Sequence, residues 1–166
     1  MNLVVTGADD EALLLDLLNT TPVVDGTPTD TLADFETAAP WLVEHDIPAV
    51  RSEYTALLEA RETVQAIVRD GQPASTLQPI LEATQLVPTA TAHGIEWRLN
   101  ENSGAVRAAL AWDSLRITSP GRLRPCANTE CHLFLIDRSK PNTARWCSMA
   151  ACGNRMKARR HYSRKS

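Results

Sequence analysis

Cysteine is missing from the first 125 residues of this 166-residue chain, and all three of its lysines lie at or beyond residue 140. Long apolar runs are missing as well, because no stretch approaches the ~20 apolar residues of a membrane-spanning helix. The N-terminal segment lacks the basic start of a signal peptide, and acidic residues interrupt its apolar runs. These absences predict a cytoplasmic protein that does not enter a membrane.

Patterns that carry enzyme chemistry are also scarce. The segment VVTGADDEA is superficially similar to the first turn of a dinucleotide-binding fold, but it lacks the G-x-G-x-x-G run. His45, His93 and His161 are scattered, with no serine or cysteine at a spacing that would make a catalytic pair. We therefore predict a protein that is not an enzyme.

The cysteines of the chain are concentrated near its C-terminal end. Its four cysteines form two C-x4-C pairs separated by fifteen residues: Cys126, Cys131, Cys147 and Cys152. Four thiolates in paired spacing are typical of one tetrahedral Zn²⁺ site, which would be structural because no position is left for a catalytic water. His132 could replace one ligand, although four cysteines already complete a tetrahedron. Two disulfides or free thiols are the alternative, which a reducing compartment disfavours.

Charge is distributed as unevenly as cysteine. Residues 122–166 hold eleven Lys/Arg against Glu130 and Asp137, a net charge of +9. Residues 1–121 hold six Arg against eighteen acids, a net charge of −12. The basic part is short and poor in large apolar residues, so it needs a metal or disulfides to fold. The chain is therefore predicted to have an acidic domain at 1–121 and a basic, metal-stapled domain at 122–166, which suits a polyanionic partner.

The acidic domain is predicted to be mostly helical. Apolar residues recur at helical spacing in four segments, and Gly71 follows the longest of them as a stop signal. Asp30 or Thr31 could cap a further short helix, and Pro40 is expected to restart a helix. The four main helices are expected at residues 11–19, 49–70, 75–86 and 105–117.

Two polar residues, Asp16 and Asn19, interrupt the first of these helices. Asp16 either pairs inside the domain, for instance with Arg61, or contacts a ligand, and buried acids are usually paired. The sequence assigns no role to Asn19.

A small β element completes this domain. Alternation around His93-Gly94 predicts a hairpin with Trp97 and Leu99 on one face. The sequence Ser119-Pro120-Gly121 is the best linker, because the charge changes sign there. The predicted fold class is therefore α+β: mostly α with a small β element, a helical N-terminal domain followed by a small zinc-stapled finger.

The basic domain is predicted to contain a strand at 133–136, a turn at 137–142 and a helix that begins near Cys152. The helix has no clean apolar face, so it gains little from packing against the body and suits the groove of a polyanion. A solvated, frayed basic tail is the alternative.

Residues 122–160 resemble the CGNR-type zinc finger of bacterial proteins, which is named after the run Cys152-Gly153-Asn154-Arg155. The segment LLLDLLNT is similar to the L-D-F-x-N-T segment that opens the domain paired with this finger. His132 and Leu133 depart from the glycine and tryptophan common there. The other matching positions are Cys126, Ala127, Asn128, Cys131, Asp137, Arg138, Ser139, Arg145, Trp146, Cys147, Ser148, Met149, Lys157, Ala158, Arg159 and Arg160.

The resemblance implies a stress-induced transcription regulator with an N-terminal sensory or interaction domain and a C-terminal DNA-binding finger. Arg155 and Arg159 would be candidate base readers, because arginine pairs bidentately with guanine. The sequence does not fix which basic residues read bases and which contact phosphates. The remaining candidates for contact with nucleic acid are Arg138, Lys140, Arg145, Lys157, Arg160 and Arg164.

Two other functions compete with binding to double-stranded DNA. An RNA-binding module would use similar knuckles and basic helices. A protein-interaction adaptor would dock the basic tail on acidic partners or on its own acidic domain. The sequence also permits a small-molecule effector of the N-terminal domain and a homodimer, without requiring either. Aromatic walls for an effector pocket would come from Trp41, Trp97 and Trp112.

Overall fold

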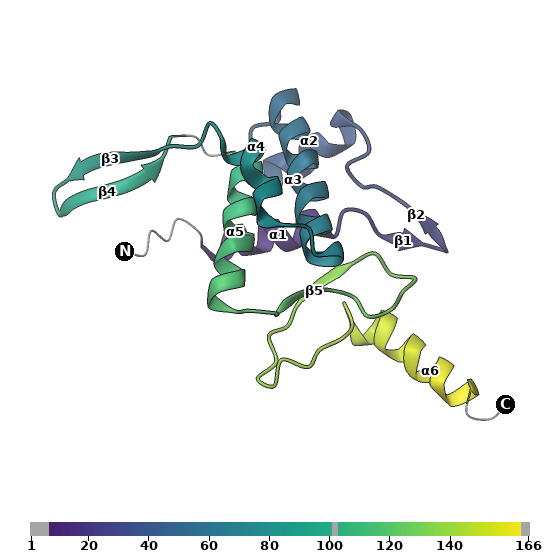
Figure 1. The fold of residues 1–166 in the computed structure, drawn as a ribbon. Coiled ribbons are helices and arrows are strands. Elements are labelled where there is room, and N and C mark those ends of the chain that lie inside the picture. Colours follow the sequence, from purple (N-terminus) through teal and green to yellow (C-terminus); the bar gives the residue numbers. More distant parts are fainter. Residues whose placement is uncertain (1–6, 101–102, 164–166) are drawn as a thin grey trace.

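The computed structural model describes residues 7–100 and 103–163, apart from the side chain of Arg160. A bundle of helices forms the body, a long hairpin projects from one side of it, and a small finger lies beneath it (Figure 1). The bundle contains α1 (Ala8–Leu18), α2 (Phe35–Glu44), α3 (Arg51–Asp70) and α5 (Gly104–Thr118). The mostly α fold with small antiparallel sheets is thus as predicted.

The core lies where α1, α3 and α5 pack together. Four leucines of α1 are fully buried, and α3 turns Leu57, Ala60 and Val64 toward them. The helix α5 buries several alanines, whose small side chains allow its close approach to α3. Gly71 ends α3 in the left-handed conformation with φ 71°, which glycine adopts without steric cost.

Three helix predictions were wrong. Asp34, rather than Asp30 or Thr31, caps α2, because its side chain accepts a hydrogen bond of 2.8 Å from the Thr37 N–H. Asp30 instead accepts hydrogen bonds from Arg61. Pro40 lies inside α2 and does not begin a new helix. The segment expected as one helix at 75–86 holds a 3₁₀ turn, η1 (Ala74–Leu77), and the short α4 (Gln78–Leu81).

Leu86, at the end of the segment expected as a helix, belongs to a hairpin instead. The strands β3 (Leu86–Thr91) and β4 (Gly94–Leu99) pair antiparallel, with Leu86 opposite Leu99 and Thr91 opposite Gly94. The hairpin therefore extends further than the sequence suggested. A shorter hairpin, β1 (Val23–Val24) with β2 (Thr27–Pro28), follows α1.

Arg61 is buried in the body, but its partner is Asp30 and not Asp16. The Arg61 guanidinium donates two hydrogen bonds of 2.7 Å to the Asp30 carboxylate and one of 2.9 Å to Thr20 Oγ1. Burial raises the pKa of Asp30, but the bonds from Arg61 and Leu32 outweigh it and hold that pKa below its usual range. Asp16 lies on the exposed side of α1, 3.2 Å from His45 Nε2.

The finger packs directly against the bundle. Its strands β5 (Leu123–Pro125) and β6 (Phe134–Ile136) pair antiparallel, and Phe134 is 1% exposed within the core of the body. Asn19, at the end of α1, accepts a 2.7 Å hydrogen bond from the Phe134 N–H and donates one of 3.3 Å to its carbonyl. The Arg69 guanidinium lies 4.6 Å from the Phe134 ring centroid. The two predicted domains therefore share one apolar core.

Among the described residues, no helix combines the length and apolar character needed to span a membrane.

Candidate metal centre and nucleic-acid interface

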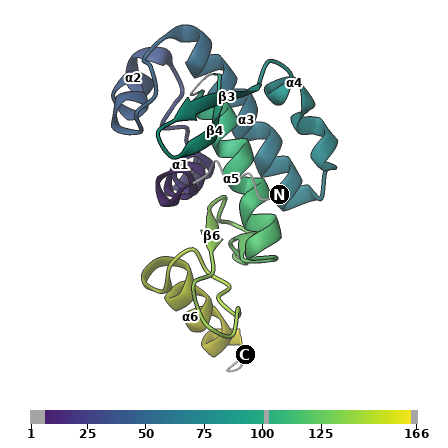
Figure 2. The same cartoon turned by 90° about the vertical axis from the view of Figure 1, so that its left-hand side faces the viewer.

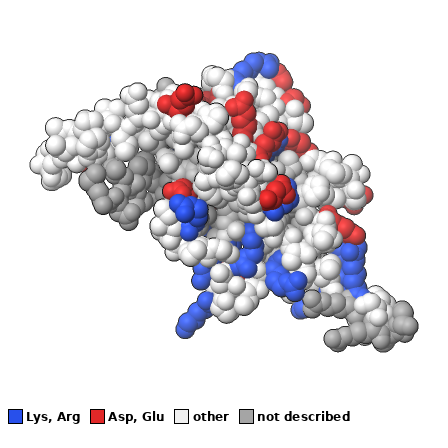
Figure 3. All heavy atoms as spheres, in the orientation of Figure 1, with Lys and Arg blue, Asp and Glu red and all other residues white. Residues whose placement is uncertain are grey.

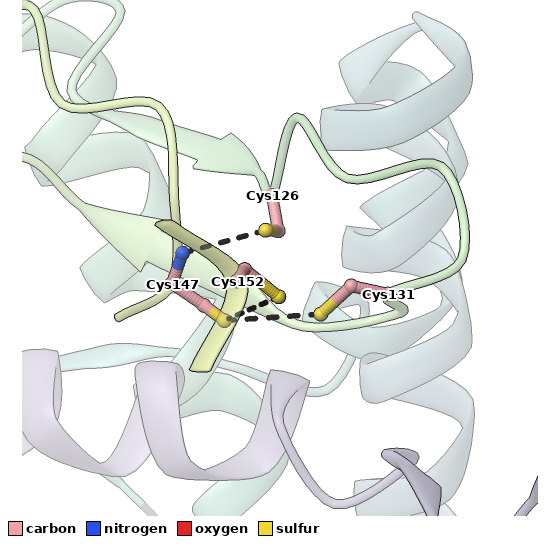
Figure 4. A group of neighbouring side chains, drawn as sticks. All are labelled: Cys126, Cys131, Cys147 and Cys152. Carbon is pink, nitrogen blue, oxygen red and sulfur yellow. Dashed lines mark hydrogen bonds between the residues drawn. The ribbon is translucent and has the colours of Figure 1, made fainter. Parts of the chain in front are cut away.

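The four cysteines converge on one point in the finger (Figure 4). Their sulfur atoms all lie within 4.8 Å of one another, and the Cys147 Sγ is 3.8 Å from that of Cys131 and 3.7 Å from that of Cys152. A tetrahedron with Zn–S bonds of about 2.3 Å has S–S edges of about 3.8 Å. A disulfide would require an S–S distance of about 2 Å. The arrangement therefore fits one zinc ion held by four thiolates, as predicted, and not two disulfides.

Backbone turns and hydrogen bonds place these sulfurs. The first pair lies on the loop between β5 and β6, where the Cys131 N–H donates to the Asn128 carbonyl at 2.8 Å. The side chain of Asn128 is buried and donates to Cys152 Sγ at 3.4 Å, while the Cys147 N–H donates to Cys126 Sγ at the same distance. N–H donors directed at sulfur stabilise thiolate ligands of a metal.

The pKa values indicate why a cation is needed. Burial, together with the neighbouring sulfurs, raises the pKa of the Cys131 thiol to about 11 and raises that of Cys147 further. Burial acts on Cys152 in the same direction, but the hydrogen bond from Asn128 and the adjacent thiols lower its pKa. Four ionised sulfurs at this separation repel one another, so Zn²⁺ would supply the charge that keeps them ionised.

A buried carboxylate organises the loop between the cysteine pairs. Asp137 is 1% exposed and accepts hydrogen bonds of 2.8 Å from the Ser139 and Ala144 N–H groups. Arg124 pairs with it at 3.1 Å. Bonds from Ser139 and Ala144 and the charge of Arg124 lower the pKa of Asp137, against the opposing effect of burial. Sequence reasoning missed this role, although Asp137 was among the matching positions.

The second cysteine pair leads into the basic helix. A π-helical turn, η2 (Met149–Gly153), begins after Ser148, whose hydroxyl accepts a 3.1 Å hydrogen bond from the Ala151 N–H. A Cβ atom at Gly153 would lie 2.6 Å from Met149 Sδ, so glycine leaves room for this side chain. The helix α6 (Asn154–Ser163) follows at once and is therefore anchored at its start by Cys152.

The candidate basic residues fall into three groups. Lys140, Arg145, Arg155 and Lys157 are exposed. Arg138 pairs with Glu11 of α1, and Arg159 pairs with Glu130 at 2.7 Å, which raises the pKa of Arg159. The backbone of Arg160 lies in α6, and Arg164 lies outside the described residues.

Two further arginines of the finger, which the sequence did not single out, have structural roles. Arg122 donates hydrogen bonds of 2.7 Å to the carbonyls of Asp137 and Ser139. Arg124 pairs with the Asp137 carboxylate, as described above. The sequence did not predict these structural roles, because the hydrogen-bond partners of the two arginines lie 13 to 17 residues away in the chain.

The tryptophans proposed as pocket walls do not meet. Trp41 stacks on His45 with ring centroids 3.9 Å apart, and Trp112 lines a shallow cleft between α3, α5 and β5. Trp97 lies on the projecting hairpin and is 47% exposed. An effector site built from these three residues is therefore not formed.

Comparison with known protein families gives two matches. Residues 122–165 match the CGNR zinc finger, and residues 11–128 match a domain described as a putative stress-induced transcription regulator. Among curated proteins, no significant match was found. The two matched regions overlap at 122–128, where β5 joins the finger to the bundle. The chain therefore belongs to the family of putative stress-induced transcription regulators, with a CGNR zinc finger at its C-terminal end.

Proposed function

We propose that this protein regulates transcription by binding double-stranded DNA through its zinc-held finger and the exposed face of α6. It acts as a binding protein in the cytoplasm and not as an enzyme. The observation that carries the proposal is the exposed basic surface of the finger, formed by the loop between the two cysteine pairs and by α6, whose start is fixed by a metal ligand. Four exposed residues contribute to this surface: Lys140, Arg145, Arg155 and Lys157.

The distribution of charge supports this surface as the interface. On the face shown in Figure 3, most of the lysine and arginine side chains gather at the finger, while the acidic side chains lie mainly over the helical bundle. Clustered Lys and Arg neutralise phosphates and release counterions, which gives affinity for DNA. The acidic bundle would face away from the duplex, because its charge repels phosphate.

The ion pairs refine the assignment of roles. Arg159 is held by Glu130, so it orients α6 against the first cysteine loop and is a weaker candidate for base reading. Arg138 joins the finger to α1 through Glu11. Arg155, one turn from Cys152 at the start of α6, is then the favoured base reader, and Lys140, Arg145 and Lys157 are favoured phosphate contacts.

A paired substitution tests the interface. Arg155→Ala with Lys157→Ala should weaken binding to mixed-sequence duplex DNA about tenfold or more. The slope of log affinity against log salt should fall by about 1, because Lys157 is the phosphate contact of the two. The measurement is fluorescence anisotropy across a salt series. Zinc content should not change, since neither side chain contacts a cysteine.

The matched control removes two arginines from the bundle, Arg51→Ala with Arg116→Ala. Both side chains are exposed and lie in ion pairs of the body, so the change in net charge is the same. Equal losses of DNA affinity in the two variants would contradict an interface on α6. Tighter binding of a matched RNA would favour the RNA-binding alternative, and no binding to either would favour the adaptor.

A further inference from the structure

The hairpin β3–β4 has one face made entirely of apolar residues. Residues directly opposite one another in an antiparallel pair share a face, and the register places three apolar pairs together. Of their side chains, Leu86 is 37% exposed, Ile95 69% and Trp97 47%. The face consists of Leu86, Pro88, Ala90, Ile95, Trp97 and Leu99.

The opposite face of the hairpin is largely polar and includes an ion pair. Arg98 lies 2.8 Å from Glu96 within β4, and both side chains are exposed. The hairpin stands away from the bundle in Figure 1 and points toward the viewer in Figure 2. An isolated two-stranded hairpin is marginally stable in water, so an apolar face of this kind requires a partner.

The two outer edges of the hairpin differ. Pro88 lies opposite Trp97, and proline has no N–H, so this pair cannot exchange hydrogen bonds within the hairpin. The outer edge of β3 therefore lacks a backbone N–H donor at its centre, which disfavours pairing with a further strand on that side. The Trp97 N–H and carbonyl point outward from β4, which pairs with no other strand among the described residues.

The sequence of β4 is complementary to itself around Trp97. If two copies of β4 run antiparallel with Trp97 on the two-fold axis, Ile95 lies opposite Leu99 of the second copy. Glu96 then lies opposite Arg98 of the second copy, and the reverse pair forms on the other side. Apolar residues meet apolar residues and each acid meets a base, which is the arrangement that stabilises neighbouring strands.

Other registers lack this complementarity. A two-fold axis at Glu96 places the two Glu96 carboxylates opposite each other, and an axis at Arg98 does the same for the two guanidinium groups. A register shifted by one residue places apolar side chains opposite polar ones and reverses their faces. One register of β4 thus satisfies both the charges and the apolar face.

We propose that two copies of this protein associate through β4, forming a four-stranded antiparallel sheet in the order β3–β4–β4–β3 with Trp97 at the two-fold axis. The apolar face becomes continuous across both copies, and the Trp97 side chains become neighbours. The occupant is a second copy because the charge pattern of β4 matches its own reverse. This inference does not depend on the proposed binding to DNA. If both hold, each dimer carries two fingers.

Charge reversal tests the proposal. Glu96→Arg places an arginine opposite Arg98 of the second copy at two symmetric positions, and Arg98→Glu places acids opposite each other in the same way. Each single variant should raise the dimer dissociation constant about tenfold or more in sedimentation velocity across a concentration series. The double variant Glu96→Arg with Arg98→Glu restores opposite charges and should return the dimer.

A matched reversal on the bundle is the control. Glu36→Arg disrupts the exposed Glu36–Arg51 pair, changes net charge by the same amount as Glu96→Arg and should leave the dimer intact. Circular dichroism and zinc content should be unchanged in all four variants, because the hairpin lies outside the core. A monomeric wild-type chain at all concentrations, or a dimer that the single reversals leave unaltered, would overturn the proposal. Loss of the dimer in the double variant would also overturn the proposal.

Discussion

Cys147→Ser should abolish zinc binding and unfold the finger. A serine hydroxyl stays protonated and is a poor ligand for Zn²⁺, while the three remaining cysteines cannot close the tetrahedron. The zinc content found by metal analysis should fall from one ion per chain to nearly none. The DNA affinity that depends on a folded finger should be lost with it.

The same substitution should also weaken the helical bundle. Phe134 lies in the shared core, and Asn19 exchanges two hydrogen bonds with its backbone, so an unfolded finger withdraws both. Removing a buried phenylalanine costs about 3–5 kcal/mol. We therefore expect the bundle to stay helical by circular dichroism but to melt at a clearly lower temperature.

The matched control for this experiment is Thr143→Ser, which keeps a hydroxyl in an exposed position of the same finger. It should leave zinc content and thermal stability unchanged. Full zinc occupancy in Cys147→Ser would be incompatible with a four-cysteine site. An unchanged melting temperature of the bundle would mean that the finger folds independently of it.

Asp30→Asn should destabilise the body by about 3 kcal/mol, because it leaves the Arg61 charge buried without its anionic partner. Both guanidinium contacts to Asp30 measure 2.7 Å, and Arg61 is 4% exposed. Replacing Arg61 by methionine in the Asp30→Asn background removes the uncompensated charge and should recover part of the loss. Denaturant unfolding of the two single variants and the double variant measures this coupling.

The ion pair also predicts a dependence on pH. The pKa of Asp30 is lowered in the folded state, so its stabilising effect is fully present above the unfolded pKa of about 4 and is lost as pH falls through the folded pKa. The Asp30→Asn variant should lack this part of the acid destabilisation. Asp70→Asn, an exposed change at the end of α3, is the control and should retain it. Equal acid sensitivity in both variants would argue against the pair.

The metal site was predictable from sequence because its ligands are local pairs. Two C-x4-C spacings predict a tetrahedral site without knowledge of the rest of the fold, and the abrupt change of charge marks where the finger begins. The longest helix was predictable for a similar reason, since its apolar spacing and Gly71 stop lie within one segment.

Contacts between distant segments were not predictable. Asp16 was the suggested partner of Arg61, and Asp30 was expected only as a helix cap. The observed pairing with Asp30 depends on how the loop after α1 folds back over α3. Asn19 received no role because its partner lies 115 residues later. The same limitation made Phe134 seem part of a separate small domain, whereas it lies in the core of the body.

The hairpin illustrates a different limit. A hairpin around His93-Gly94 was predicted; the turn consists of Ala92 and His93, and Gly94 begins β4. Trp97 and Leu99 do share a face, as predicted. The length of the hairpin was underestimated because Leu86, the last apolar residue of the helix expected at 75–86, belongs to β3. Only the observed register shows that the apolar residues of both strands form one exposed face.

The most direct test of zinc-dependent DNA binding is fluorescence anisotropy of one protein sample with mixed-sequence duplex DNA, before chelation, after chelation and after zinc is restored. Binding should weaken steeply with salt, disappear on chelation and return with zinc. Equal binding after chelation would mean that an unfolded basic tail contacts DNA, and that result would contradict a metal-organised interface.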